Sequence, residues 1–276
     1  MKPLTLTLKE PPSQRVELSA LIPDRLSGMR RSAIAAIRLQ CGNRKVKVGD
    51  LFSLSGGDAS QLQLRGDLGK FDGIGAAMAA GVITVRGRVG HQLGAAMRGG
   101  RIMVHGDAGD WLGANMHGGR IEVRGCAGNQ VGGGLPGDAH GMDGGTILIA
   151  GNAGMRVGDR MRRGIVVVKG DTGDYCGARM LAGTIVVFGN AGDFAGAGMR
   201  RGTVILIRKP ERLPASFNYC GILKMQFLRI LFHHLTREYP NLPELRGRGP
   251  LCDRYCGDLA TGGKGELMIL RASYPY

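Results

Sequence analysis

Basic side chains recur at two fixed positions of a 19-residue period. One column follows a repeated methionine and the other column ends each unit. The columns contain Arg98, His117, Arg162 and Arg200 after the methionine, and Arg86, His105, Arg124 and Lys169 at the unit end. If the units stack, each column holds cations about 5 to 10 Å apart, a spacing that suits an extended polyanion carrying carboxylates. The alternative is a solvated face, because arginine and lysine also keep sheet surfaces soluble.

An insertion at residues 133–141 interrupts the period and is a second candidate site. It reads GGLPGDAHG and includes His140. Insertions in repeat proteins map to loops on one face, and such loops often make functional contacts. The alternative is a plain surface loop.

Metal-binding and catalytic patterns are weak in this sequence. Cys252 and Cys256 have a C-x₃-C spacing without further cysteine or histidine at ligand spacing, so a zinc site is not favoured. His233 and His234 fit ordinary half-buried helical residues equally well. No set of nucleophile, base and acid can be assembled, and the aspartates of the repeat fit turns in which their side chains bond nearby backbone N–H groups. We therefore assign no catalytic and no metal-ligating residue.

The period itself predicts the architecture. Seven units fit the pattern GxxGxxxGxxMxxGxIxVx, and each unit contains one apolar, alternating segment typical of a short strand. Such a strand cannot bury its apolar face alone, so successive strands must stack in parallel, with the methionines filling the interior. The glycines supply corners that need positive φ or close backbone approach. We predict an all-β fold, a right-handed parallel β-helix of about seven coils.

The ends of such a stack need caps, because open strand edges template aggregation. Residues 1–65 are expected to form a small α/β N-terminal cap, residues 66–207 the β-helix, and residues 208–276 a C-terminal cap or extension. Within the last segment, apolar residues at helical spacing predict a helix after Cys220 that lies across the last coil.

Composition limits the classes of function. The 276 residues carry a net charge of +15 that is spread along the chain, without the basic arm of a DNA-binding tail. Seven phenylalanines, six tyrosines and one tryptophan provide few stacking platforms, so a nucleic-acid binder is disfavoured. The sequence contains neither a signal-peptide pattern nor a long apolar run, and its cysteines are scattered. We expect a cytoplasmic protein that contacts neither membrane nor nucleic acid.

Three segments carry a resemblance to a known family. VGDLFSLSG, the GDAGDxxGAxMxxGxIxVxG coils and RYCGDLATGGKGE together resemble the C subunit of formylmethanofuran dehydrogenase, especially the variant in the bacterial formyltransferase/hydrolase complex. The coils alone are also similar to the C-terminal domain of the glutamate synthase large subunit. The two ends of the chain separate these families.

The resemblance implies a non-catalytic scaffold subunit in one-carbon metabolism. Its partners would be a formyltransferase subunit, a metal-dependent amidohydrolase-like subunit and a further small subunit. The coenzymes implied are a methanofuran or methylofuran with a glutamyl tail and tetrahydromethanopterin, so the basic columns are candidates for guiding the polyanionic tail. The alternative is a stand-alone β-helix enzyme with its site at residues 133–141.

Overall fold

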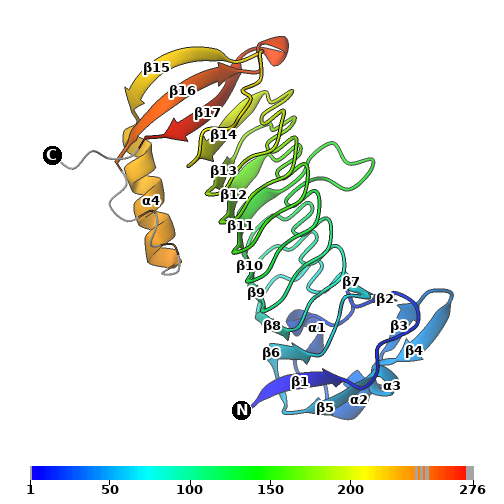
Figure 1. Cartoon of the computed structure of the whole chain (residues 1–276). Helices are drawn as coiled ribbons and strands as arrows, with labels where there is room; N and C mark the ends of the chain where they lie inside the picture. The colour runs from blue at the N-terminus through cyan, green and yellow to red at the C-terminus, as the bar shows by residue number, and fades with distance from the viewer. Residues whose placement is uncertain (1, 240–241, 243–244, 246–248, 272–276) are drawn as a thin grey trace.

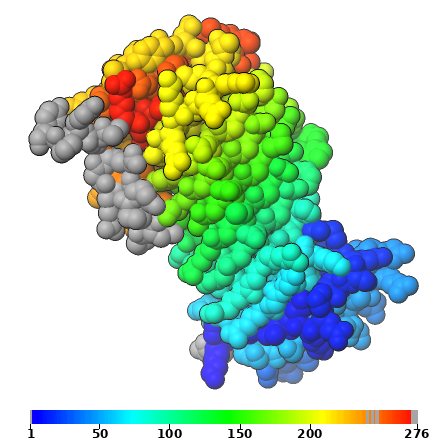
Figure 2. Space-filling view, in the orientation of Figure 1, coloured from blue at the N-terminus to red at the C-terminus, as the bar shows by residue number. Residues whose placement is uncertain are grey.

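The computed structural model describes residues 2–239, 242, 245 and 249–271. Among these residues, 13 strands form one long sheet (Figure 1). Its strands, in spatial order, are β15 (Asn218–Lys224), β16 (Leu251–Gly257), β17 (Lys264–Leu270), β14 (Arg201–Leu206), β13 (Thr184–Val187), β12 (Arg163–Val168), β11 (Asp143–Ile149), β10 (Arg120–Val123), β9 (Arg101–Val104), β8 (Val82–Arg86), β6 (Asp58–Arg65), β1 (Pro3–Leu8) and β5 (Phe52–Ser55). The molecule is elongated, with the N-terminal segment (blue) at one end of the body and the C-terminal strands (orange and red) at the other (Figure 2).

In the long sheet, the strands from β6 through β8 to β14 are parallel, and the register repeats from strand to strand except for one irregularity between Asp143 and Thr146. Ile102 pairs with Ile121, 19 residues later, whereas Ile121 pairs with Ile147, 26 residues later. The additional seven residues fall within the predicted insertion at residues 133–141, which projects from the side of the body (Figure 1). The predominance of strands and the large parallel sheet confirm the prediction of an all-β chain.

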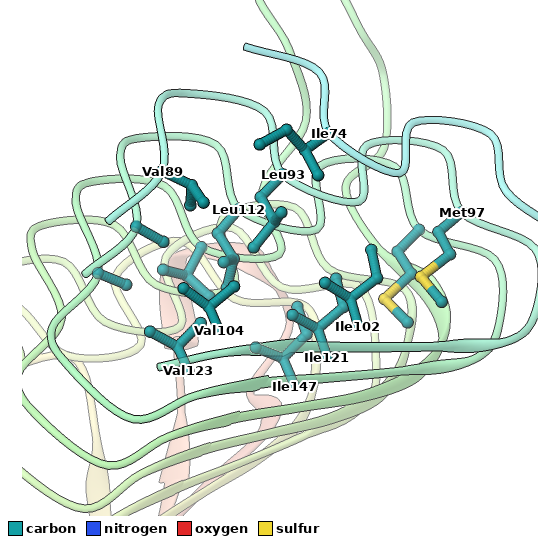
Figure 3. Packing of buried hydrophobic residues seen from close by; sticks show 14 of the residues in the cluster. Ile74, Val89, Leu93, Met97, Ile102, Val104, Leu112, Ile121, Val123 and Ile147 are labelled. Atoms are coloured by element: carbon teal, nitrogen blue, oxygen red, sulfur yellow. The ribbon is translucent and has the colours of Figure 1, made fainter. Parts of the chain in front are cut away.

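The interior between successive turns is apolar. All seven repeat methionines are fully buried, which confirms their assignment to the core: Met78, Met97, Met116, Met142, Met161, Met180 and Met199. Figure 3 shows Ile102, Ile121 and Ile147 above one another on neighbouring turns, with Met97 beside them. A second line of bridges, including Ala108 to Ala127, joins the turns on the side away from the sheet.

Glycine has two separate roles at the corners. Gly113 has a φ of +63°, and a Cβ there would lie 2.4 Å from Ile147 Cδ1. Gly106 lacks positive φ, but a Cβ there would lie 2.7 Å from the carbonyl carbon of Gly87 in the turn below. Positive φ also occurs in a column that is not glycine, an arrangement that the repeat pattern did not predict. This column contains Gln92, Trp111, Gln130, Arg156, Tyr175 and Phe194.

The N-terminal segment continues the stack and closes it. β1 pairs in parallel with β6 and antiparallel with β5. The small second sheet and the short helices beside it are β4 (Arg44–Lys47), β3 (Arg38–Cys41), β2 (Val16–Glu17), β7 (Phe71–Asp72), α1 (Pro23–Leu26), α2 (Arg31–Ala35) and α3 (Val48–Leu51). The Asp24 carboxylate accepts hydrogen bonds from the backbone N–H groups of Ala79 and Ala80, at 2.6 and 2.8 Å. In the next turn, the corresponding acceptor is the Met78 carbonyl, which accepts a hydrogen bond from the backbone N–H of Arg98.

The C-terminal segment differs from the predicted helical cap. β17 pairs in parallel with β14, and β16 and β15 extend the sheet beyond it. A 3-10 helix, Leu259–Thr261, places the Thr261 hydroxyl 2.6 Å from the Met199 carbonyl at the end of the stack.

The predicted helix is present as α4 (Gln226–Glu238), but it packs on the outer face of the sheet instead of across the last coil. The reason is that this face is apolar from β11 onward, at Leu148, Val167, Val186 and Ile205, and these residues cluster with Leu228, Phe232 and Leu235 of α4. Within the described ranges, none of the helices combines the length and apolarity needed to cross a bilayer.

Candidate anion-binding surface

The unit-end column lies on the outer face of the sheet, on the half that α4 leaves uncovered. His105 N donates to the Val85 carbonyl and Arg124 N donates to the Val104 carbonyl, so these residues and Arg86 occupy equivalent places in neighbouring turns. The strand register adds Arg65, which pairs with Arg86. Four consecutive turns therefore present a basic residue. We call Arg65, Arg86, His105 and Arg124 the outer basic column.

The sequence analysis missed Arg65 because it precedes the first complete unit. The sequence did contain an indication of Arg65, because the segment QLQLR ends in arginine as later strands do. Lys169 was placed in the same column, but Ala150 stands between it and Arg124. The continuous part of the column is thus confined to the N-terminal half of the sheet.

The pKa of His105 depends on the charge of the outer basic column. Partial burial, and then the guanidinium groups of Arg124 and Arg86, hold the pKa of His105 below its usual value. Both effects disfavour the imidazolium form. An anion bound here would reverse the electrostatic part of this shift.

The column after the methionines lies at the other end of the strands. Arg98, His117, Arg162 and Arg200 are exposed, and the backbone N–H of each donates to the methionine carbonyl of the preceding turn at 2.8 Å. Asp143 and Leu181 occupy the same position in two turns, so only Arg98 and His117 are in adjacent turns. Since Arg98 precedes β9 and His105 follows it, the two columns do not form one surface.

A polar hollow of about 440 Å³ adjoins the outer basic column where the open sheet face meets α4. Arg124 belongs to both, and the other charged groups lining the hollow are Arg101, Arg120, Glu122, Arg237 and Glu238. Arg101 and Arg120 both approach Glu122, at 2.6 and 2.7 Å. Within the described part of the chain, the buried Nε of Arg101 has no hydrogen-bond partner. The sequence analysis did not select Arg101 or Arg120, which begin their strands.

The insertion at residues 133–141 is a loop held by hydrogen bonds within it and by hydrogen bonds from Asn115 and Arg160 of other turns. Asn115 Nδ2 donates to Asp138 Oδ2 at 2.8 Å, and the backbone N–H of Leu135 donates to the same oxygen at 3.0 Å. The Arg160 guanidinium donates to the Asp138 carbonyl. His140 is exposed. These contacts order the loop. The Asp138 carboxylate has a structural role in it, as a hydrogen-bond acceptor.

The cysteine and histidine pairs do not converge on one point. Cys252 and Cys256 are four residues apart on β16, which separates them by about 13 Å. Burial raises the pKa of both thiols to about 11. His233 and His234 are exposed on α4 instead of half-buried. Among the described residues, no group of three or more histidine, cysteine or acidic side chains could hold a metal ion.

The aspartates of the repeat connect neighbouring turns. Asp107 Oδ1 accepts from the N–H of Cys126 at 2.7 Å, and Asp110 Oδ1 accepts from the N–H of Asn129 at 2.7 Å. Asp171 does the same for Asn190 at 2.6 Å. The donors belong to the next turn instead of the same one, which corrects the prediction of local Asx turns. These hydrogen bonds give the aspartates a structural role that does not require catalysis.

Comparisons with known proteins agree with the sequence motifs. A family model described as the GXGXG motif matches residues 69–229. The C subunit of the formyltransferase/hydrolase complex of Methylorubrum extorquens is 39% identical over 89 residues, which are 32% of this chain and 34% of that protein. The C subunit of the tungsten-containing formylmethanofuran dehydrogenase 2 of Methanothermobacter wolfeii is 38% identical over 94 residues, 32% of this chain and 35% of that protein. The chain thus matches about a third of the length of these curated relatives.

The structural similarity extends much further. A chain in the crystal structure of the formyltransferase/hydrolase complex of M. extorquens with methylofuran superposes with a TM-score of 0.89 and 38% identity. This superposition covers 97% of the present chain and 100% of the other. The chain therefore belongs to the GXGXG motif family and, within it, to the family of formylmethanofuran dehydrogenase C subunits.

Proposed function

We propose that this chain is the C subunit of a formyltransferase/hydrolase complex and acts there as a non-catalytic scaffold. The observation that carries the proposal is the superposition over 97% of the chain on a component of such a complex. The turns of residues 66–207 form a right-handed parallel β-helix that braces a formyltransferase subunit and an amidohydrolase-like subunit. Residues 1–65 and 208–276 are its caps, and the assembly also contains a further small subunit.

The outer basic column has a role in this proposal. It guides the anionic glutamyl tail of a methylofuran-type coenzyme, which carries formyl groups to and from tetrahydromethanopterin. Four consecutive turns place basic groups at strand spacing, about 5 Å per turn, and charge-assisted contacts with successive carboxylates fit this spacing. Lys169 and the methionine-adjacent residues Arg98, His117, Arg162 and Arg200 are secondary candidates. The metal of the hydrolase reaction belongs to the amidohydrolase-like partner.

The first experiment is affinity purification of the tagged chain from its own cells, with mass spectrometry of the co-purifying proteins and a formyltransferase assay. We expect formyltransferase and amidohydrolase-like chains in fixed stoichiometry. A chain that elutes alone would contradict the scaffold role. Formyl-transfer activity of the isolated chain would instead support an independent enzyme at residues 133–141.

The second experiment tests the outer basic column in the complex. The double variant Arg86→Glu/Arg124→Glu should weaken binding of polyglutamate and reduce its dependence on salt. The matched control is Arg38→Glu/Arg44→Glu, which changes the net charge equally at exposed positions of the N-terminal segment. Equal losses in both variants would reveal a general charge effect and refute a specific column.

A further inference from the structure

A column of planar side chains runs along one corner of the stack. The Arg156 guanidinium lies over the Tyr175 ring, 5.1 Å from its centroid. The rings of Tyr175 and Phe194 are stacked, with centroids 5.1 Å apart and an interplanar angle of 16°. All three residues have φ values near +60°, so equivalent backbone geometry presents their side chains in successive turns.

The stack ends at an exposed ring. Phe194 is 53% exposed, the highest value among the large apolar residues of the repeat turns. The 19-residue period ends with β14, and the strand that pairs with β14 next is β17, 63 residues later, so the column of the repeat does not continue past Phe194. A hollow of about 390 Å³ lies there, with Phe194, Ala197, Leu213 and Pro214 among its lining residues. The next place beside Phe194 is therefore an apolar recess.

A cation stands at the rim of this recess. The Arg212 side chain is 82% exposed, and its Nη1 lies 3.8 Å from Asp193 Oδ2, at the outer limit of an ion pair. An exposed pair of this length contributes little, so Arg212 can turn toward another carboxylate. The recess thus combines an aromatic ring with an adjacent exposed cation.

We propose that this recess binds an aromatic side chain of a partner subunit that is flanked by an acidic residue. The incoming ring extends the stack on Phe194, and the acidic residue pairs with Arg212. Aromatic pairs are most favourable with centroids about 4.5 to 7 Å apart, the range already seen between Tyr175 and Phe194. Buried aromatic and arginine contacts dominate protein interfaces. This inference rests on the proposed membership of a multi-subunit complex.

The test compares tagged variants co-expressed with the other subunits and purified under a salt wash. Phe194→Ala should reduce the recovery of one partner subunit at least about tenfold, and Arg212→Glu should reduce the same subunit. Phe194→Tyr preserves a stacking ring and should retain it. Ile230→Ala is the matched control, because Ile230 is an apolar residue of α4 that is 73% exposed and lies outside the recess.

Several outcomes would overturn the inference. Wild-type recovery of every subunit with Phe194→Ala refutes it while leaving the proposed complex intact. Failure of the wild-type chain to recover any partner refutes both. Native mass spectrometry that finds a small aromatic molecule on the wild-type chain, absent from Phe194→Ala, would replace the protein partner with a small ligand. Thermal unfolding of each variant separates loss of docking from loss of folding.

Discussion

The Arg120 guanidinium lies over the ring of Tyr239, with its central carbon 3.7 Å from the ring centroid. Arg120 Nη2 also donates to the carbonyl of Glu238 at 2.7 Å, and Nε lies 2.7 Å from Glu122. One side chain of β10 therefore holds the end of α4 against the outer face of the sheet. This contact lies at the boundary between the half of that face that α4 covers and the open, basic half.

Loss of this contact should loosen α4. We expect Arg120→Ala to lower the free energy of unfolding by about 1 to 3 kcal/mol, because it removes a cation–π contact, a charge-assisted hydrogen bond and an ion pair with Glu122 at a mostly buried site. Chemical denaturation followed by circular dichroism measures the change. Arg163→Ala is the control, since that side chain is 74% exposed and lies 4.0 Å from its carboxylate partner. An equally large effect of both substitutions would contradict the assigned role of Arg120.

The methionine column should be essential for stability. Met97→Ala leaves a cavity between turns and should destabilise the chain by about 2 to 5 kcal/mol. Met155 is 43% exposed, so Met155→Ala should change stability by less than about 0.5 kcal/mol. Thermal unfolding of both variants makes the comparison. A small effect of Met97→Ala would mean that neighbouring turns collapse into the space.

Two glycines can separate steric crowding from backbone strain. Gly113→Ala combines positive φ with a Cβ 2.4 Å from Ile147, whereas Gly137→Ala in the insertion combines positive φ with open space. Strain alone should cost about 1 to 2 kcal/mol at either position. Gly113→Ala should therefore be the more destabilising substitution in denaturant titrations. Equal losses would show that the Ile147 side chain moves away without penalty.

The affinity of the outer basic column for anions should increase as the pH falls. The pKa of His105 is lowered in the folded chain, so in the absence of ligand the unfolded state protonates first and stability declines as the pH falls below about 6.5. A bound polyanion favours the imidazolium form, so its binding is coupled to uptake of a proton by His105. Polyglutamate should bind more tightly at pH 5.5 than at pH 7.5, as measured by calorimetry.

His105→Gln tests the origin of this pH dependence. The variant should bind polyglutamate with a flatter pH profile than the wild-type chain. His233→Gln, at an exposed position of α4, should leave the profile unchanged. An unaltered profile in His105→Gln would exclude His105 as the titrating group.

The features predicted correctly from the sequence are those encoded by short periods. Alternation placed Ile102 and Ile121 inside, and the 19-residue period placed Met97 among the buried residues and located the insertion between β10 and β11. These features depend on residues near in sequence or at one repeated offset, so a single sequence contains their signal.

The remaining features depend on surfaces that the period does not describe. The outer face of β11–β14 is apolar, so α4 packs on this face. The sequence analysis had predicted that the helix would cross the last coil. The hollow beside Arg124 forms only because the end of α4 approaches β10, so Arg101 and Arg120 carried no recognisable pattern. The positive φ of Phe194 likewise follows from the geometry of the corner and not from its side chain.

The hydrogen bonds between turns have a consequence for how this body can change in length. Arg98 N donates to the Met78 carbonyl and His117 N to the Met97 carbonyl, so each turn repeats the contacts of the one before. Duplication or deletion of one whole unit would conserve every column and change the length by about 4.8 Å. Any other change must leave the stack as a loop, as residues 133–141 do. The length of the molecule can therefore change only in steps of one whole turn.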